Sequence, residues 1–167
     1  FLSIPKPGAK LELPDRILGL AEYESVFIYM AEAALPLDKY PQIEKTLENL
    51  KASKDGILLN RGWALEISRV GLSGTESNEW EFILPEPLLS QAVIRTRRPG
   101  DKINVEGMQG SVPLKKLFIN EKIPARYRDA YPILVVDGEV VWVPGLRKAA
   151  IQQGDQPDCL LRFKRHA

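Results

Sequence analysis

The strongest constraint on the fold lies in the stretch from Pro132 to Val143, which reads PILVVDGEVVWV. Two runs rich in β-branched and aromatic residues flank Asp137-Gly138, and an Asp-Gly pair in this place favours the left-handed conformations of a two-residue type I′ turn. The stretch therefore predicts a β-hairpin, and Pro144-Gly145 marks the end of its second strand.

Several other stretches show the alternation of apolar and polar residues that is typical of β-strands. In the stretch 62–70, Trp63, Leu65 and Ile67 share one face. Strands are also predicted on both sides of a turn at Pro14-Asp15, and over 23–30, 80–84 and 91–98. The stretch 85–91 is predicted to form a turn or a single helical turn, and 159–166 is either a last strand or a tail.

Two stretches show the helical period instead. From Tyr40 to Lys51, Ile43, Leu47 and Leu50 recur at i, i+4 and i+7, which predicts an amphipathic helix.

A second helix is predicted within 113–122, with Leu114, Leu117 and Phe118 on its buried side. Ser111 is its expected N-cap, and the helix must end before Pro124 because a residue that precedes proline disfavours helical geometry. A further short helical turn is predicted in 125–131.

Together these patterns predict an α+β fold in two small mixed domains, with antiparallel strands and a few short helices. The stretch 85–91 separates them, so we expect one domain at 1–88 and another at 89–167. A chain of 167 residues can bury a substantial core without disulfides. The chain does not begin with methionine, which leads us to expect a piece of a longer protein.

The composition argues against several classes of protein. One cysteine, Cys159, cannot form an internal disulfide and fits a reducing cytoplasm, so we expect a cytoplasmic protein. The single histidine, His166, lies next to the chain end, which argues against a Cys–His catalytic pair and against a zinc site of these residues. No catalytic or metal-ligating residue is predicted. No apolar run is long enough to span a membrane, and no signal peptide is recognisable.

Charge is distributed unevenly along the chain. Residues 1–90 carry a net charge of −5 and residues 91–167 a net charge of +6, although the total is only +1. The stretch Ile94–Ile103, IRTRRPGDKI, places three arginines at the end of a predicted strand. Such a cluster is typical of phosphate binding, and solvated salt bridges are the alternative. Asp101 either pairs with one arginine or orients the turn, and the few acids nearby in sequence predict that the cluster stays positive.

The order of motifs in the basic half resembles a known family. The arginine strand IRTRRPGDKI, the helix stretch KKLFINEKIP and the hairpin stretch YRDAYPILVVDGEVVWVPGLR together resemble the C-terminal domain of tRNA(Ile)-lysidine synthase. The resemblance covers Ile94–Arg147, about a third of the chain. Residues 1–90 resemble the preceding substrate-binding region of that family only loosely.

The resemblance implies a tRNA-recognising part of a ligase. The family enzyme uses ATP to adenylate the wobble cytidine of isoleucine tRNA with a CAU anticodon, and free lysine then attacks that base. Its ATP- and Mg²⁺-binding N-terminal domain carries an S-G-G-x-D-S loop, and no such loop occurs in this sequence. The resemblance therefore implies that this chain binds no cofactor itself, and that its partners are the tRNA body and acceptor stem and its own N-terminal catalytic domain.

Ten cations are predicted to contact RNA phosphate or sugar groups. They are Arg95, Arg97, Arg98, Lys102, Lys115, Lys116, Lys122, Arg126, Arg128 and Arg147. A second interpretation is a packing or dimerisation domain without RNA contact, whose arginines pair with acids of the first 90 residues. The sequence leaves homodimerisation open.

Overall fold

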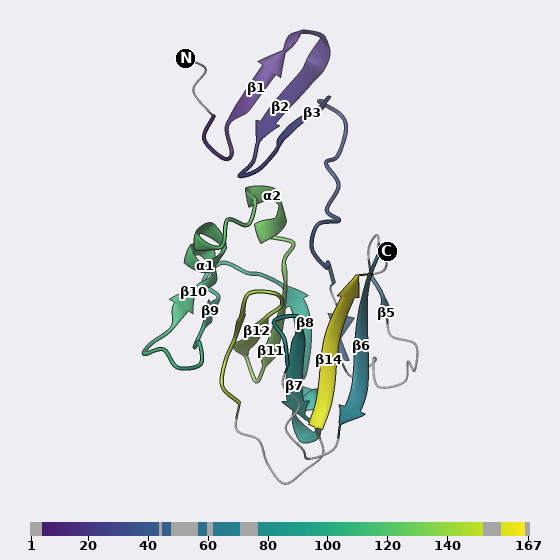
Figure 1. Cartoon of the computed structure of the whole chain (residues 1–167), viewed down its shortest axis with the longest axis vertical. Helices are drawn as coiled ribbons and strands as arrows, with labels where there is room; N and C mark the ends of the chain where they lie inside the picture. Colours follow the sequence, from purple (N-terminus) through teal and green to yellow (C-terminus); the bar gives the residue numbers. More distant parts are fainter. Residues whose placement is uncertain are drawn as a thin grey trace.

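The computed structural model describes residues 5–43, 45–47, 57–59, 62–70, 77–151 and 158–165. These residues form three β-sheets with short helices at their edges (Figure 1). The predicted α+β class is confirmed. Within the described part of the chain, no helix is both long enough and apolar enough to cross a bilayer.

Sheet A is an antiparallel meander at one end of the molecule (Figure 1). Its strands are β1 (Lys10–Leu13), β2 (Ile17–Ala21) and β3 (Val26–Met30). The 3-10 turn η1 (Pro14–Arg16) joins the first two strands, which confirms the strand, turn and strand predicted around Pro14-Asp15.

Sheet B is the largest, and the predicted hairpin lies at its centre. Asp137 and Gly138 both have positive φ, 48° and 81°, as the expected type I′ turn requires. The strand order is β10-β9-β12-β11-β8-β4, with β13 paired to β12. The bounds are β4 (Lys45–Thr46), β8 (Ala92–Thr96), β9 (Lys102–Ile103), β10 (Val112–Pro113), β11 (Pro132–Val136), β12 (Glu139–Val143) and β13 (Arg147–Lys148).

Sheet C contains the last strand of the chain in its interior. The order is β5-β6-β14-β7, so β14 forms antiparallel ladders with both β6 and β7. The bounds are β5 (Ile57–Leu58), β6 (Trp63–Val70), β7 (Glu81–Pro85) and β14 (Asp158–Arg165). Of the two alternatives for the end of the chain, the strand is correct.

The part of the chain that the structure describes also contains the short helical elements η3 (Glu86–Gln91), α1 (Leu114–Asn120) and α2 (Ala125–Arg128). The predicted buried side of α1 is confirmed, because Leu114, Leu117 and Phe118 are all buried. The predicted N-cap, Ser111, is wrong. Strand β10 runs directly into the helix, Pro113 occupies the N-cap, and the Leu114 N–H donates to the Asp101 carbonyl at 2.9 Å. Because that backbone contact satisfies the N–H, no side-chain cap is needed there.

The amphipathic helix predicted from Tyr40 to Lys51 is wrong over the residues that the structure describes. Residues 40–43 have no regular structure, and Lys45 and Thr46 pair with β8 as strand β4. Ile43 and Leu47 are nevertheless buried. An isolated short helix is marginal, whereas an open sheet edge offers backbone partners, so these two apolar residues reach the core from positions on either side of strand β4. Residues 44 and 48–51 lie outside the described residues.

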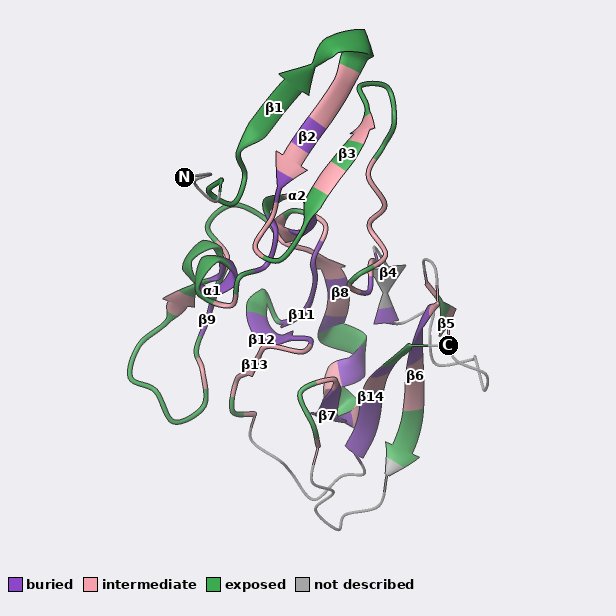
Figure 2. Ribbon diagram, turned by 45° about the horizontal axis from the view of Figure 1, so that its top comes forward, coloured by how far each residue is buried: buried purple, intermediate pink, exposed green. Residues whose placement is uncertain are grey.

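Two hydrophobic clusters fill the space between these layers, as the buried segments in Figure 2 show. One lies between sheets B and C, where Trp142 packs against Phe82 and Phe163 with ring centroids 5.5 and 5.4 Å apart. The other lies between sheet B and helices α1 and α2.

Hydrogen-bonded strands join the two sides of the domain boundary expected between residues 88 and 89. Strand β4 precedes that boundary and pairs with β8, while β14 follows it and pairs with β6 and β7. The division at 88 and 89 therefore does not coincide with a break between sheets, and it stays a prediction about the organisation of a longer protein.

Two glycines with positive φ test how tightly sheet C packs on the hairpin. A β-carbon on Gly145 (φ 73°) would lie 2.3 Å from the Trp80 ring, whereas one on Gly138 (φ 81°) would meet nothing within 4 Å. We expect Gly138→Ala to cost about 1 kcal/mol through backbone strain alone, and Gly145→Ala to cost about 1–3 kcal/mol more. Urea unfolding of both variants measures the difference, and equal losses would contradict close packing of Trp80 on Gly145.

Candidate nucleic-acid interface

The turn between β8 and β9 is organised by Asp101. Its carboxylate accepts two hydrogen bonds from Arg95, Nη1 to Oδ2 at 2.8 Å and Nη2 to Oδ1 at 2.9 Å. Oδ2 also accepts the backbone N–H of Arg98 at 2.6 Å. Asp101 thus pairs with an arginine and also orients the turn. Both alternatives that the sequence left open are therefore correct.

The Arg95–Asp101 pair is largely withdrawn from solvent, because the side chains are 17% and 12% exposed. Burial acts to raise the pKa of the Asp101 carboxyl, but the hydrogen bonds from Arg95 and from the Arg98 backbone outweigh it, and the pKa lies below the ordinary value of 3.8. The carboxylate is therefore charged throughout the physiological range. Arg95 is committed to an internal contact, in contrast to its predicted role on RNA.

Arg97 is also paired within the protein. Its guanidinium donates to the Asp129 carboxylate at the end of α2, and its backbone N–H donates to the Tyr131 carbonyl at 3.1 Å. The expectation that too few acids would neutralise the arginine strand is therefore wrong. Asp129 is 32 residues away in sequence, but the ladder between β8 and β11 brings the two residues together.

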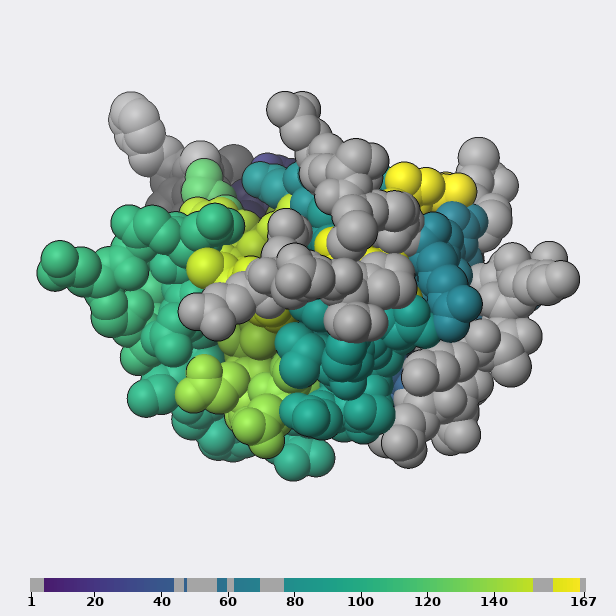
Figure 3. Space-filling model, turned by 90° about the horizontal axis from the view of Figure 1, so that it is seen from below, coloured from purple at the N-terminus to yellow at the C-terminus, as the bar shows by residue number. Residues whose placement is uncertain are grey.

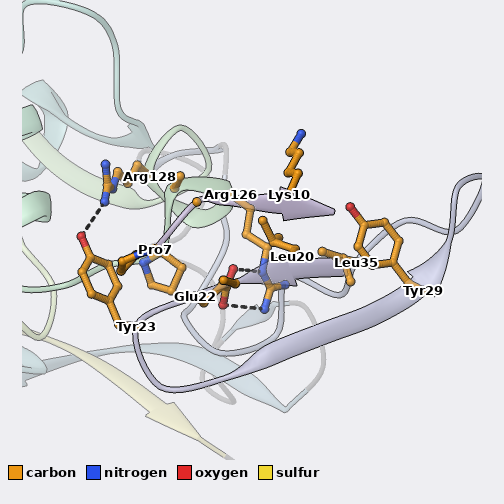
Figure 4. A pocket seen from close by; sticks show the side chains of 13 residues that line it. Pro7, Lys10, Leu20, Glu22, Tyr23, Tyr29, Leu35, Arg126 and Arg128 are labelled. Carbon is orange, nitrogen blue, oxygen red and sulfur yellow. Dashed lines mark hydrogen bonds and ion pairs between the residues drawn. The ribbon is translucent and has the colours of Figure 1, made fainter. Parts of the chain in front are cut away.

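Arg126 attaches sheet A to helix α2, as Figure 4 shows. Its Nε donates to Glu22 Oε1 at 2.7 Å, and its Nη1 donates to the Pro36 carbonyl. The guanidinium carbon lies 4.5 Å from the ring centroid of Phe27 and 4.3 Å from that of Tyr127, which are cation–π distances. Because its guanidinium donates to two groups of the protein and lies against two aromatic rings, Arg126 is a structural residue.

Arg128 has a similar role beside it. Its Nε donates to the Ile123 carbonyl at 2.8 Å and its Nη2 to the Tyr23 hydroxyl at 3.1 Å (Figure 4). The two arginines border a cavity of about 450 Å³ between sheet A and α2, lined largely by apolar side chains such as Leu20 and Leu35.

Arg147 connects β13 to the end of α1. It donates to Glu121 Oε1 at 2.5 Å and to the Leu146 carbonyl at 2.6 Å. Together with the residues above, five of the ten predicted RNA-binding cations are held by contacts inside the protein.

The other five cations are exposed, and we call them the basic surface. Among the residues that the structure describes, no ion pair or hydrogen bond involves their side chains. They are Arg98, Lys102, Lys115, Lys116 and Lys122.

The backbone brings two of these cations, Lys102 and Lys115, close together. The ladder between β9 and β10 places Lys102 opposite Pro113, one residue before α1 begins, and Asp101 accepts the Leu114 N–H. Lys102 follows Asp101 and Lys115 follows Leu114, so the hydrogen bond between Asp101 and Leu114 holds the two lysines near each other. Seen from the end away from sheet A (Figure 3), the segment that contains β9 and β10 lies beside the β11–β12 hairpin, to which β9 is paired.

The described residues contain no group of three or more histidine, cysteine or acidic side chains that could hold a metal ion. Cys159 is buried on β14, and His166 lies outside the described residues.

The sequence reasoning missed the acids that pair with the arginines, Glu22 and Asp129. Nothing in a single sequence marks such distant partners.

The structure thus defines a β-rich domain that presents exposed cations from a turn, a strand and a short helix. The family model for the TilS substrate C-terminal domain matches residues 92–164. A crystal structure of a TilS C-terminal domain aligns with a TM-score of 0.54 and 31% identity, covering 62% of this chain and 85% of that one. The chain belongs to the TilS C-terminal domain family, which confirms the resemblance seen in the sequence.

Full-length relatives extend well beyond this chain. The bifunctional protein TilS/HprT of Listeria monocytogenes is 29% identical over 145 residues, which cover 86% of this chain and 21% of that protein. The tRNA(Ile)-lysidine synthase of Bacillus subtilis is 32% identical over 120 residues, which cover 69% of this chain and 25% of that protein. The chain therefore spans a fifth to a quarter of the length of these curated relatives.

The buried pair at the turn gives a pH-dependent prediction. Because the pKa of Asp101 is lowered on folding, its stabilisation is present above the ordinary carboxyl pKa and is lost as the pH falls through the folded value. We expect Asp101→Asn to lower the free energy of unfolding by about 2–3 kcal/mol near neutral pH, with a smaller difference from wild type below about pH 4.

The matched control is Asp129→Asn, which removes the partner of Arg97. The Asp129 side chain is 82% exposed, so this change should cost less than about 1 kcal/mol. Chemical denaturation at several pH values measures both variants. A loss for Asp101→Asn that is small, or that does not depend on pH, would argue against a buried charge pair.

Arg126 gives a second prediction, about how sheet A is attached. Arg126→Ala removes the ion pair to Glu22 and the contact with Phe27, so sheet A should separate from α2 while sheets B and C remain folded. Hydrogen exchange should then become at least about tenfold faster in 31–39 and in β3, but not in β11. Lys122→Ala, a change of equal charge on the basic surface, should leave exchange in these segments unaltered.

Proposed function

We propose that this chain is the tRNA-binding C-terminal part of a tRNA(Ile)-lysidine synthase of the cytoplasm. The longer enzyme would ligate lysine to the wobble cytidine of isoleucine tRNA, with ATP and Mg²⁺ bound by an N-terminal catalytic domain. Family membership and the names of the full-length relatives support this assignment. In this proposal the chain supplies no catalytic group and holds the tRNA body and acceptor stem.

The single observation that carries the proposal is the basic surface. Its cations are exposed and have no partner among the described residues, while neighbouring arginines are fixed by acids. Exposed ammonium groups gain most from a polyanion, because binding releases the counterions condensed on its phosphates. Folded RNA is recognised largely through its backbone and shape, which suits cations held on a rigid turn and helix.

The structure also changes which cations we propose as RNA contacts. Arg95, Arg97, Arg126, Arg128 and Arg147 now have structural roles, since each donates to a group within the protein. The proposed phosphate contacts are the five cations of the basic surface.

One observation favours the alternative of a packing domain without RNA contact. Arg126 pairs with Glu22, and Lys164 pairs with Glu66 at 2.8 Å, so cations of the basic half do meet acids of the first 90 residues. These pairs lie within one chain, and they leave the basic surface unexplained. The alternative predicts that removing lysines from α1 has no effect on tRNA binding.

Two double variants separate these functions. Lys115→Ala/Lys116→Ala removes two charges from the basic surface, and Lys164→Ala/Arg165→Ala removes two from β14 in sheet C as a control. With folded isoleucine tRNA, the first variant should bind about tenfold more weakly, and its log–log salt slope should fall by about 2 in magnitude. The control should bind like wild type in filter binding at several salt concentrations. Identical salt slopes for the two variants would refute the basic surface as a tRNA contact.

A further inference from the structure

The two faces of sheet A differ in how they are covered. Residues directly opposite each other in antiparallel strands share a face, and the ladders align Lys10 with Leu20 and Phe27. This inner face meets α2, because Phe27 lies under the Arg126 guanidinium and Leu20 lines the cavity beside it.

The opposite face is apolar and uncovered. The ladders place Leu11 beside Gly19 and Ile28, and Leu13 beside Ile17 and Met30. We call this the outer face of sheet A, with Val26 at its end.

Large apolar side chains gather on the outer face. The exposed fractions are 60% for Leu11, 39% for Leu13, 63% for Val26, 71% for Ile28 and 49% for Met30. These are five of the eight large hydrophobic residues that are exposed in the described part of the chain, and Figure 2 shows exposed positions along β1 and β3. A contiguous exposed apolar patch marks an interaction surface.

An apolar face of a sheet is normally packed against another layer of the structure. Helix α2 meets the inner face through Arg126 and Phe27, and no described residue is positioned to shield the five side chains of the outer face. Isolated exposed hydrophobic residues are common, but five aligned on one face of a three-stranded sheet are not explained by chance exposure. Something outside the described residues is therefore expected to cover the outer face.

We propose that the outer face of sheet A is the docking surface for the polypeptide that precedes this domain in the full-length ligase, an inference that rests on the proposed function. The curated relatives devote most of their length to residues outside the region similar to this chain. The matched family is described as a C-terminal domain, so residues that precede it are expected in the full-length proteins. Sheet A is the first element of the described chain and stands at one end of the molecule (Figure 1), where preceding residues can reach it.

The proposed partner surface is apolar and neutral, because the outer face offers aliphatic and thioether side chains and no charge in its centre. The contact would set the position of the basic surface relative to the catalytic domain. Arg126 and Arg128 hold the inner side of the same sheet, so sheet A would be a layer between the two parts of the enzyme.

The two methionines of the chain can be used to test this proposal. They are Met30 on the outer face and Met108 in the loop before β10, and the two have similar exposed fractions of 49% and 58%. The rate of methionine oxidation follows exposure. In the full-length protein without tRNA, we expect Met30 to be oxidised at least about fivefold more slowly than Met108, as measured by peptide mass spectrometry after peroxide treatment.

A variant of the outer face tests the cause of the protection. Val26→Lys/Ile28→Lys in the full-length protein should restore the oxidation rate of Met30 to near that of Met108, because buried lysines oppose docking. Leu58→Lys on β5 changes an apolar residue of sheet C that is even more exposed, at 81%, and should leave Met30 protected. Circular dichroism and the unchanged rate at Met108 would show that both variants are folded.

Three results would overturn the proposal. Equal oxidation of Met30 and Met108 in the wild-type full-length protein would show that the outer face is free. Protection of Met30 that weakens on dilution would assign the face to a second copy of the chain. Protection that appears only after tRNA is added would assign it to RNA.

Failure of the proposed function gives a different signature. Bound tRNA should slow oxidation of Met108, which lies in the loop joining β9 to β10 beside the basic surface. No effect of tRNA on Met108, together with protected Met30, would contradict the tRNA contact and leave the docking surface standing.

Discussion

The ion pair between Arg95 and Asp101 joins the three parts from which the basic surface projects. Arg95 belongs to β8, Asp101 ends the turn, and the Asp101 carbonyl accepts the first N–H of α1 from Leu114. A bidentate guanidinium–carboxylate contact fixes both distance and orientation, and its low exposure protects it from screening by salt. The strand, the turn and the helix are thereby held in one arrangement, so their exposed cations need little ordering when they meet a polyanion.

The ten cations predicted to contact RNA divide by side-chain type as well as by exposure. The five that are fixed inside the protein are all arginines, whereas four of the five on the basic surface are lysines. A planar guanidinium can satisfy several acceptors in fixed directions while it stacks on aromatic rings, and Arg126 lies at cation–π distance from both Phe27 and Tyr127. An ammonium group on a flexible stem keeps its hydration and can adjust to a phosphate of variable position.

The pairing of strands that are distant in sequence decides which parts of the chain share a core. Strand β14 forms ladders with both β6 and β7, so sheet C is complete only when the last residues of the chain are in place. Trp142 then packs from the hairpin against Phe82 and Phe163, which are rings of sheet C. Sheets B and C therefore share a core, and sheet A, attached mainly through α2, is the part that stands apart (Figure 1).

The sequence by itself determined the features that depend on neighbouring residues: the Asp137-Gly138 hairpin, the buried side of α1, the class of fold and the family. These follow from turn geometry and short-range periodicity, which act within a few residues. Only the tertiary structure decided which cations are free, because Arg97 and Arg126 find their acids 32 and 104 residues away. It also decided that residues 40–43 and strand β4 are not helical, since an isolated short helix is marginal and the open edge of β8 offers the backbone partners.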